Sequence, residues 1–164
     1  MKRATLALLA VVSLLACDPV HTRAVDALGG ETPGVPRGPL HRPGQPCLLC
    51  HDGAFGDPRA FAMAGTVFQS ANAVTPLEGA TITLLGADGS TQTATTNAAG
   101  NFYLSTSEYT PHYPVHVKSI VSGGKSIFMQ SHIGENGSCA GCHADPSGPD
   151  SPGHVYFDIT GTPP

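Results

Sequence analysis

The chain has 164 residues, with 12 acidic and eight basic side chains and a formal charge of −4 at pH 7 when histidine is neutral. This balance excludes a nucleic-acid partner held by a basic surface, and the length is that of about one domain. Charged residues make up only 12% of the chain, and its 20 glycines and 15 prolines are typical of an exported, loop-rich β protein.

The N-terminus predicts export and lipid attachment. Lys2 and Arg3 precede the apolar residues 4–15, a stretch too short to span a membrane as a helix. The sequence Leu-Leu-Ala-Cys that ends at Cys17 resembles a bacterial lipobox, in which the cysteine is acylated and becomes the new N-terminus. We therefore expect residues 1–16 to be a lipoprotein signal peptide. The alternative is an ordinary cleaved signal in which Cys17 has no role.

Residues 17–46 are predicted to be an acylated cysteine followed by a tether. Residues 18–46 contain six prolines and five glycines without a sustained apolar period. Such a composition cannot bury enough apolar surface to offset the entropy of ordering it. Removal of residues 1–16 would leave 148 residues with six basic and twelve acidic side chains, a formal charge of −6.

The rest of the chain alternates between short β-like runs and turn signals. The runs are residues 64–68, 80–85, 91–96, 101–104, 114–121, 125–129 and 154–159. Asp88-Gly89 predicts a hairpin, and residues 97–100 predict the next reversal. About seven short strands favour an antiparallel β-sandwich. Alternation in the second run places Ile82 and Leu84 on one face of the strand. In the fifth run it places Val115, Val117 and Val121 on one face.

Residues 79–104, GATITLLGADGSTQTATTNAAGNFYL, resemble the carboxypeptidase-regulatory-like or prealbumin-like β-sandwich. This resemblance implies an all-β, Ig-like/prealbumin-like fold and says little about function, because such modules carry adhesion, sugar-binding and structural roles alike. The predicted sandwich covers residues 61–129. It is flanked by a first loop, residues 47–60, and by a second loop with the final strand, residues 130–164.

Four of the five cysteines form two pairs, each followed directly by a histidine: Cys47, Cys50 and His51, and Cys139, Cys142 and His143. Both CLLCH and CAGCH match the attachment pattern of covalent c-type haem. Its chemistry needs two thiols on one short turn, each forming a thioether to a haem vinyl group, and an imidazole directly behind them to reach the iron. The sequence therefore predicts two covalently bound haem groups.

Three other interpretations of the cysteine pairs remain. A zinc site could use four thiolates, alone or with the histidines, although structural zinc of this type is commoner in reducing compartments. Two local disulfides would close loops too short to constrain the unfolded chain much, and they would leave the histidines unexplained. Chance would have to place a histidine behind both pairs independently.

The two motifs and the lipobox together resemble dihaem c-type cytochrome lipoproteins of bacterial envelopes. The resemblance implies thioethers at the four cysteines and proximal iron ligands at His51 and His143. It also implies a lipid anchor in the cell envelope, with the outer membrane favoured, and redox proteins there as electron donor and acceptor. Most small dihaem cytochromes are helical, whereas here residues 52–138 separate the motifs with β-like sequence, so the helical fold is not expected.

An electron carrier also needs a sixth ligand on each iron, histidine or methionine. His41 lies six residues before Cys47 and His132 lies seven before Cys139, and six extended residues reach about 20 Å, so these two are the first candidates. His154 is the reserve for the second haem. Among the remaining candidates, His21 is expected in the solvated tether. His112 and His116 are expected at the surface or at a haem edge. Met63 and Met129 are expected in the core.

The predicted function is electron transfer by a membrane-anchored dihaem c-type cytochrome that is not an enzyme. The alternative from another class is a haem-containing binding or redox- or gas-sensing module, whose sandwich docks a protein or polysaccharide. A peroxidase-like enzyme is disfavoured, because no acid-base constellation accompanies either motif. A lipoprotein sandwich with disulfides is the interpretation without haem.

Overall fold

The computed structural model describes residues 18–31, 33–54 and 59–158. The chain divides into two compact units, Met1–Gly30 and Glu31–Pro164. The predicted signal peptide and Cys17 lie outside the described residues. No helix in the described part of the chain is long and apolar enough to cross a membrane.

The first unit contains the helix α2, Pro19–Ala27. The Asp18 carboxylate caps it by accepting hydrogen bonds from the N–H groups of Val20, at 2.9 Å, and His21, at 3.1 Å. Pro19 occupies the first turn, where a missing N–H group costs nothing. None of the helix side chains is buried. Part of the predicted tether is therefore helical, and local capping stabilises this helix although none of its side chains is buried.

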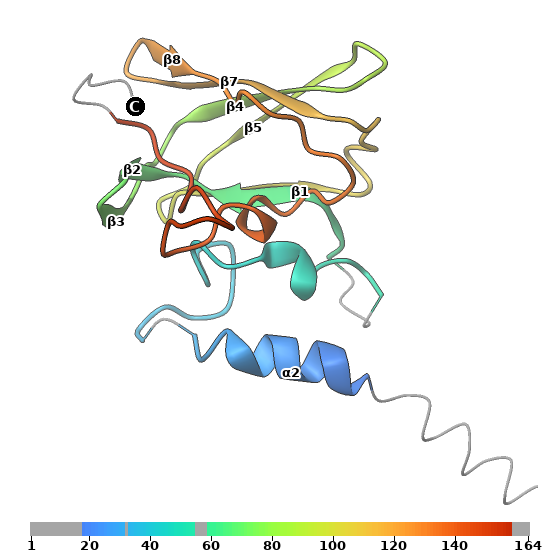
Figure 1. Cartoon of the computed structure of the whole chain (residues 1–164), viewed down its shortest axis with the longest axis vertical. Helices are drawn as coiled ribbons and strands as arrows, with labels where there is room; N and C mark the ends of the chain where they lie inside the picture. Colours follow the sequence, from blue (N-terminus) through green and yellow to red (C-terminus); the bar gives the residue numbers. More distant parts are fainter. Residues whose placement is uncertain (1–17, 32, 55–58, 159–164) are drawn as a thin grey trace, which may run out of the picture. The chain divides into compact units, whose positions relative to one another are not determined.

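The second unit is all-β, as predicted (Figure 1). Its strands are β1 Phe61–Thr66, β2 Phe68–Ser70, β3 Ala73–Pro76, β4 Thr81–Leu85, β5 Thr91–Thr95, β6 Asn101–Ser105, β7 His116–Ser122 and β8 Lys125–Ile127. They form a four-stranded sheet in the order β5-β4-β7-β8 and two pairs, β1-β6 and β2-β3, with antiparallel pairing throughout. Two short 3-10 helices, η1 Cys47–Leu49 and η2 Cys139–Gly141, coincide with the cysteine motifs.

Two parts of the strand prediction differ from the structure. The hairpin β2-β3 was not expected, because its exposed strand β3 has no apolar alternation. Residues 154–158, part of the last predicted strand, instead run alongside Phe68 through a parallel bridge. The Phe68 N–H group donates to the carbonyl of Val155 at 2.9 Å, and the Phe157 N–H group donates to the carbonyl of Phe68 at 2.8 Å.

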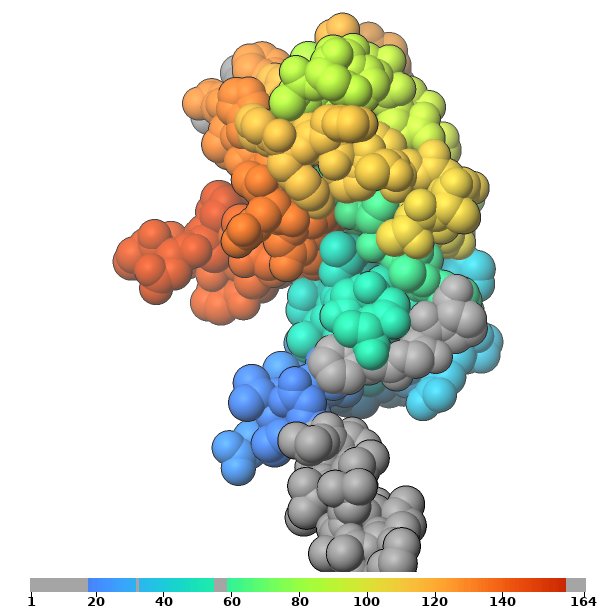
Figure 2. Space-filling model, turned by 90° about the vertical axis from the view of Figure 1, so that its right-hand side faces the viewer, coloured from blue at the N-terminus to red at the C-terminus, as the bar shows by residue number. Residues whose placement is uncertain are grey.

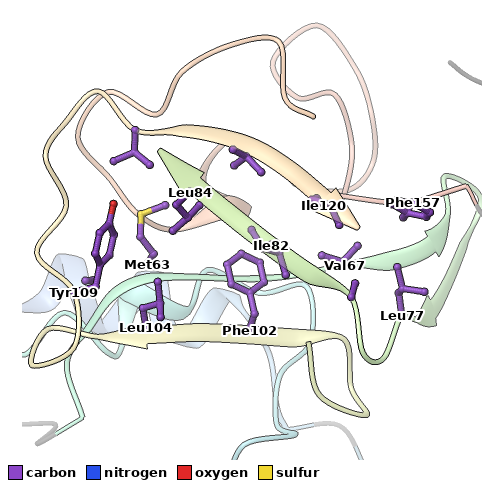
Figure 3. Packing of buried hydrophobic residues seen from close by; sticks show 14 residues of the cluster. Met63, Val67, Leu77, Ile82, Leu84, Phe102, Leu104, Tyr109, Ile120 and Phe157 are labelled. Carbon is purple, nitrogen blue, oxygen red and sulfur yellow. The ribbon is translucent and has the colours of Figure 1, made fainter. Parts of the chain in front are cut away.

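The core lies between the four-stranded sheet and the β1-β6 pair (Figures 1 and 3). Ile82 and Leu84 face it from β4, as predicted, and Phe102 faces it from β6. Met63 is fully buried there, and Met129 is partly buried against the same cluster. The expectation that both methionines belong to the core is confirmed.

A β-bulge in β7 changes which of its side chains face the core. Thr83 pairs with Ser119 and Leu84 with Val117, so Lys118 is an extra residue on β7. An extra residue reverses the alternation beyond it. Val115 and Val117 are buried as predicted. The prediction for Val121 is wrong, because this side chain is 38% exposed and Ile120 takes its place in the core.

The segment that leads into the first motif is held against one end of the β1-β6 pair. The Asn101 side-chain amide donates to the carbonyls of Pro39, at 3.3 Å, and His41, at 3.1 Å. The Gly44 N–H group donates to the Thr66 hydroxyl at 2.7 Å, and this hydroxyl donates to Asn101 Oδ1 at 2.7 Å. The side chains of Thr66 and Asn101, at the ends of β1 and β6, therefore hold the last part of the predicted tether in place.

Thr66→Val keeps the shape of the side chain but removes the hydroxyl that joins Gly44 to Asn101. Both polar partners then lose a bond inside the protein, which costs about 1–3 kcal/mol. We expect the free energy of unfolding in urea to fall by about this amount. Thr95→Val, at an exposed position of β5, is the control and should change it by about 0.5 kcal/mol or less. Equal stability of the two variants would contradict a structural role for the hydroxyl.

Candidate functional site

The first motif folds as a single tight turn. The N–H groups of Cys50 and His51 both donate to the carbonyl of Cys47, at 3.2 and 3.0 Å. His51 is buried, with 6% of its surface exposed, and its Nδ1 atom lies 3.2 Å from the carbonyl oxygen of Arg59. The turn thus holds both cysteines and the histidine in one compact loop.

The second motif repeats this arrangement. The N–H groups of Cys142 and His143 both donate to the carbonyl of Cys139, at 3.1 and 2.8 Å. His143 Nδ1 lies 3.1 Å from the carbonyl oxygen of Gly153. Two loops of different sequence therefore share one backbone turn and one way of holding the histidine ring.

The partners of the two rings decide which nitrogen carries the proton. A carbonyl oxygen only accepts, so Nδ1 donates and the lone pair of the neutral ring is on Nε2. Metal-ligating histidines commonly donate their second nitrogen in this way, which fixes the ring and makes the ligand more basic. Sequence reasoning missed Arg59 and Gly153 because the contact uses their backbone carbonyls, which almost any residue can supply.

Strand β1 brings the two motifs together. The Phe61 N–H group, at its start, donates to the carbonyl of His51 at 2.7 Å. The Ala64 N–H group, at its middle, donates to the carbonyl of Gly137 at 2.9 Å, and Ser138 bridges Ala64 in parallel. Figure 1 shows the two motif turns, turquoise and red-orange, next to β1. In Figure 2 the chain near residue 50 and the chain near residue 145 both reach the surface in view.

Glycines allow this close approach at the second motif. A Cβ atom added to Gly65 would lie 2.6 Å from Cys139 Sγ and 2.7 Å from its Cβ. A Cβ atom added to Gly137 would lie 2.0 Å from the carbonyl oxygen of Ala62. The second motif can therefore contact β1 only because both facing positions lack a side chain.

The first cysteine of each motif is a protonated thiol at neutral pH. Burial raises the pKa of Cys47 to about 11, with Cys50 adding to the effect. Burial raises the pKa of Cys139 to about 12, and the nearby Cys47 adds to that rise. The four motif cysteines are free thiols. No group of three or more histidine, cysteine or acidic side chains is arranged for a metal ion in residues 18–31, 33–54 and 59–158.

His41 lies next to the first motif histidine, as its position before the motif predicted. The ring centres of His41 and His51 are 5.8 Å apart and the rings are tilted by 48°. Nδ1 of His41 contacts the carbonyl of Gly38 and also accepts from the Gly38 N–H group at 3.3 Å. Two imidazoles on opposite sides of one metal ion, each with a metal–nitrogen distance of about 2 Å, have ring centres about 6 Å apart. The observed separation fits such a pair.

His132 is placed against a different histidine. Its ring centre is 4.9 Å from that of His116, whose Nε2 atom lies 2.5 Å from the carbonyl oxygen of Met129. His116 belongs to β7, in the four-stranded sheet. The structure thus brings His132 to the edge of that sheet, whereas the second motif lies on β1.

His154, the reserve candidate, is buried and uses both nitrogens within the fold. Its Nδ1 lies 2.6 Å from a carboxylate oxygen of Asp145, and its Nε2 lies 2.9 Å from the carbonyl oxygen of Ser70. The ring also meets Phe68 edge-on, with centres 4.7 Å apart. This histidine links the loop after the second motif to β2.

A stack of rings extends from the first motif to the surface. His51 stacks on Phe61 with ring centres 4.5 Å apart, and Phe61 stacks on Tyr103 at 4.8 Å. Tyr103, on β6, is 40% exposed. Together with the Arg59 carbonyl, the stack fixes the plane of the His51 ring.

Comparison with known proteins assigns no family, since no family model, curated protein or solved structure matches the chain. The chemical interpretation of the two motifs therefore rests on their residues and geometry. That geometry consists of two cysteine turns packed against one strand, each followed by a histidine whose Nδ1 is held by a backbone carbonyl.

Gly65→Ala is expected to displace the second motif, since the new methyl group would overlap Cys139. Overpacking of this kind costs about 1–3 kcal/mol. The free energy of unfolding in urea should fall by that amount. Gly134→Ala is the matched control, because its Cβ would meet no heavy atom within 4 Å. A loss of stability that is no larger for Gly65→Ala than for Gly134→Ala would contradict the close approach.

The link between His154 and Asp145 predicts a pH-dependent stability. Burial opposes the charged form of His154, but the Ser70 carbonyl and the Asp145 carboxylate outweigh it and raise the pKa of His154. The hydrogen bond from His154 lowers the pKa of Asp145. The stabilisation is lost as pH rises through the folded pKa of His154, and as pH falls through that of Asp145. It should be largest between about pH 4 and pH 6.5.

Asp145→Asn measures this contribution as the difference from wild type in the free energy of unfolding across pH. We expect the difference to peak in that window and to shrink on both sides. Asp88→Asn is the control, because Asp88 forms a 3.5 Å ion pair with the exposed His112 and should give a smaller difference. A difference for Asp145→Asn that is constant with pH would mean that the pair is not charged in the folded protein.

Proposed function

We propose that this chain is a dihaem c-type cytochrome that carries electrons in the bacterial cell envelope and is not an enzyme. The observation that supports it is the common geometry of the two motifs, in which two cysteines share one turn and a backbone carbonyl holds Nδ1 of the following histidine. In this proposal the four motif cysteines form thioethers, and two histidines are the proximal iron ligands, His51 and His143.

The residues of both motifs fit a covalent haem. All four sulfurs are free thiols, as addition to two vinyl groups per haem requires. A haem iron takes four ligands from the porphyrin, so each site needs at most two protein ligands and no larger cluster of metal-binding side chains. Bound haem supplies a one-electron iron couple, and the protein sets its potential through ligands, hydrogen bonds and burial.

The chain's own groups have distinct tasks in this proposal. The Arg59 and Gly153 carbonyls hold the Nδ1 protons, so that Nε2 of each ring stays the ligand atom. Burial of His51 keeps water from this ring. Because both motif turns pack against β1, the two haems would be attached beside the same strand, and such proximity favours electron exchange between them.

The remaining parts of the proposal concern the scaffold and its location. We infer that the four-stranded sheet and the β1-β6 pair are the two layers of the predicted Ig-like/prealbumin-like sandwich, with β2-β3 and residues 154–158 closing one side. Acylation at Cys17 would tether this domain to a membrane of the envelope, with the outer membrane favoured. Envelope redox proteins would then act as electron donor and acceptor.

The test is the haem content of protein produced with cytochrome c maturation machinery, counted per chain after alkaline pyridine treatment. Wild type should carry two covalent haems. Cys50→Ala and Cys142→Ala should each carry one, because each removes a thioether from one motif only. Cys17→Ala is the cysteine control and should keep both haems while losing the lipid anchor. A colourless wild type, or two haems in both motif variants, would overturn the proposal.

A further inference from the structure

We infer that the two haem sites are not equivalent: His41 closes the first iron opposite His51, whereas the second iron keeps a position open for a small diatomic ligand such as carbon monoxide. This inference rests on the proposed function and deepens it. It is carried by the positions of the seven histidines of the second unit, all of which lie within the described residues.

The first site has a second imidazole close to its motif histidine. The 5.8 Å between the ring centres of His41 and His51 matches the spacing of about 6 Å for two rings on one metal ion. Nδ1 of each ring contacts a backbone carbonyl, of Gly38 for His41 and of Arg59 for His51. Asn101 holds the backbone of His41 through its carbonyl at 3.1 Å. Both rings are therefore oriented before any metal binds.

Histidines near the second motif in sequence are committed to other contacts. His154 uses Nδ1 on Asp145 and Nε2 on Ser70, so ligation would break both bonds of a buried ring. Losing hydrogen bonds of a buried polar group is costly, and more so for a charged one. His154 therefore belongs to the fold and is not a ligand in reserve.

His132 lies by the four-stranded sheet, whereas the second motif is held on β1. Its neighbour Ile133 exchanges two backbone hydrogen bonds with Val115, at 2.9 and 2.8 Å, at the edge of the four-stranded sheet. The motif itself is held on β1 through Gly137. His132 instead contacts His116, which is bonded to the Met129 carbonyl.

The other candidate ligands are also placed elsewhere. His112 Nε2 lies 3.5 Å from Asp88 at the β4-β5 turn. Met63 is fully buried in the core and Met129 packs against it. The described residues of the second unit, Glu31–Pro164, thus provide a partner ring for His51 but assign none to His143, and an iron with one axial ligand binds diatomic molecules.

The experiment is a carbon monoxide titration of the reduced protein with both haems attached, read as bound carbon monoxide per chain beside haem per chain. Wild type should bind one equivalent per two haems. His41→Ala should raise this to two, because the first iron is opened. His112→Ala is the control for loss of an unrelated histidine and should bind one. Cys142→Ala, which keeps only the first haem, should bind none.

Each outcome decides separately on the two proposals. Two haems with no bound carbon monoxide would overturn the inference and leave the cytochrome proposal standing; recovery of one equivalent in His132→Ala would then identify His132 as the second distal ligand. Two equivalents in wild type would overturn closure by His41. A haem count below two in wild type is a failure of the cytochrome proposal itself.

A second measurement covers the case in which His41→Ala fails to fold or to take up haem. The oxidised wild-type protein should show two ferric signals of equal amount by electron paramagnetic resonance, one low-spin and one high-spin. The low-spin signal corresponds to the iron with two histidines, and the high-spin signal to the iron with one. Two low-spin signals would contradict the inference without any variant.

Discussion

Hydrogen bonding along both edges of β1 is the constraint on which the rest of the structure depends. One edge pairs with β6, and the other accepts the chain at Gly137 immediately before the second motif. The first motif contacts the start of the same strand through the carbonyl of His51. The segment of the second motif bonds to the backbone of β1 and therefore lies very close to it. A side chain on the strand would overlap this segment, and Gly65 avoids the overlap opposite Cys139.

The two motifs show how backbone groups can orient a histidine ring. Each histidine ring is held by a carbonyl that lies eight or ten residues further along the chain, at Arg59 or Gly153. Both carbonyls are positioned by neighbouring chain that bonds to the β domain. A ring held in this way is fixed relative to the sheet and not only to its own loop.

Sequence reasoning recovered the local features of the fold and missed the non-local ones. Alternation and the Asp88-Gly89 turn predicted β4 and β5 because both signals lie within a few residues. The bulge at Lys118 was missed because it depends on the register of β7 with β4. Residues 154–158 were predicted to be a full strand, but they form only a bridge to Phe68, a contact between distant segments that local sequence does not reveal. The motifs were read directly from spacing, whereas their positions on β1 depend on pairing between distant segments.

The contrast between His41 and His154 shows why a histidine near a motif is not sufficient evidence for a ligand. His154 faces a carboxylate on one side and a carbonyl on the other, so both nitrogens donate and the ring favours its charged form. A charged imidazole has no lone pair to give to a metal. His41 has its Nδ1 contact at Gly38 and a ring beside His51. The same residue type thus stabilises the fold after the second motif and lies beside the motif histidine before the first, so the two motifs differ in their histidine surroundings although their turns are alike.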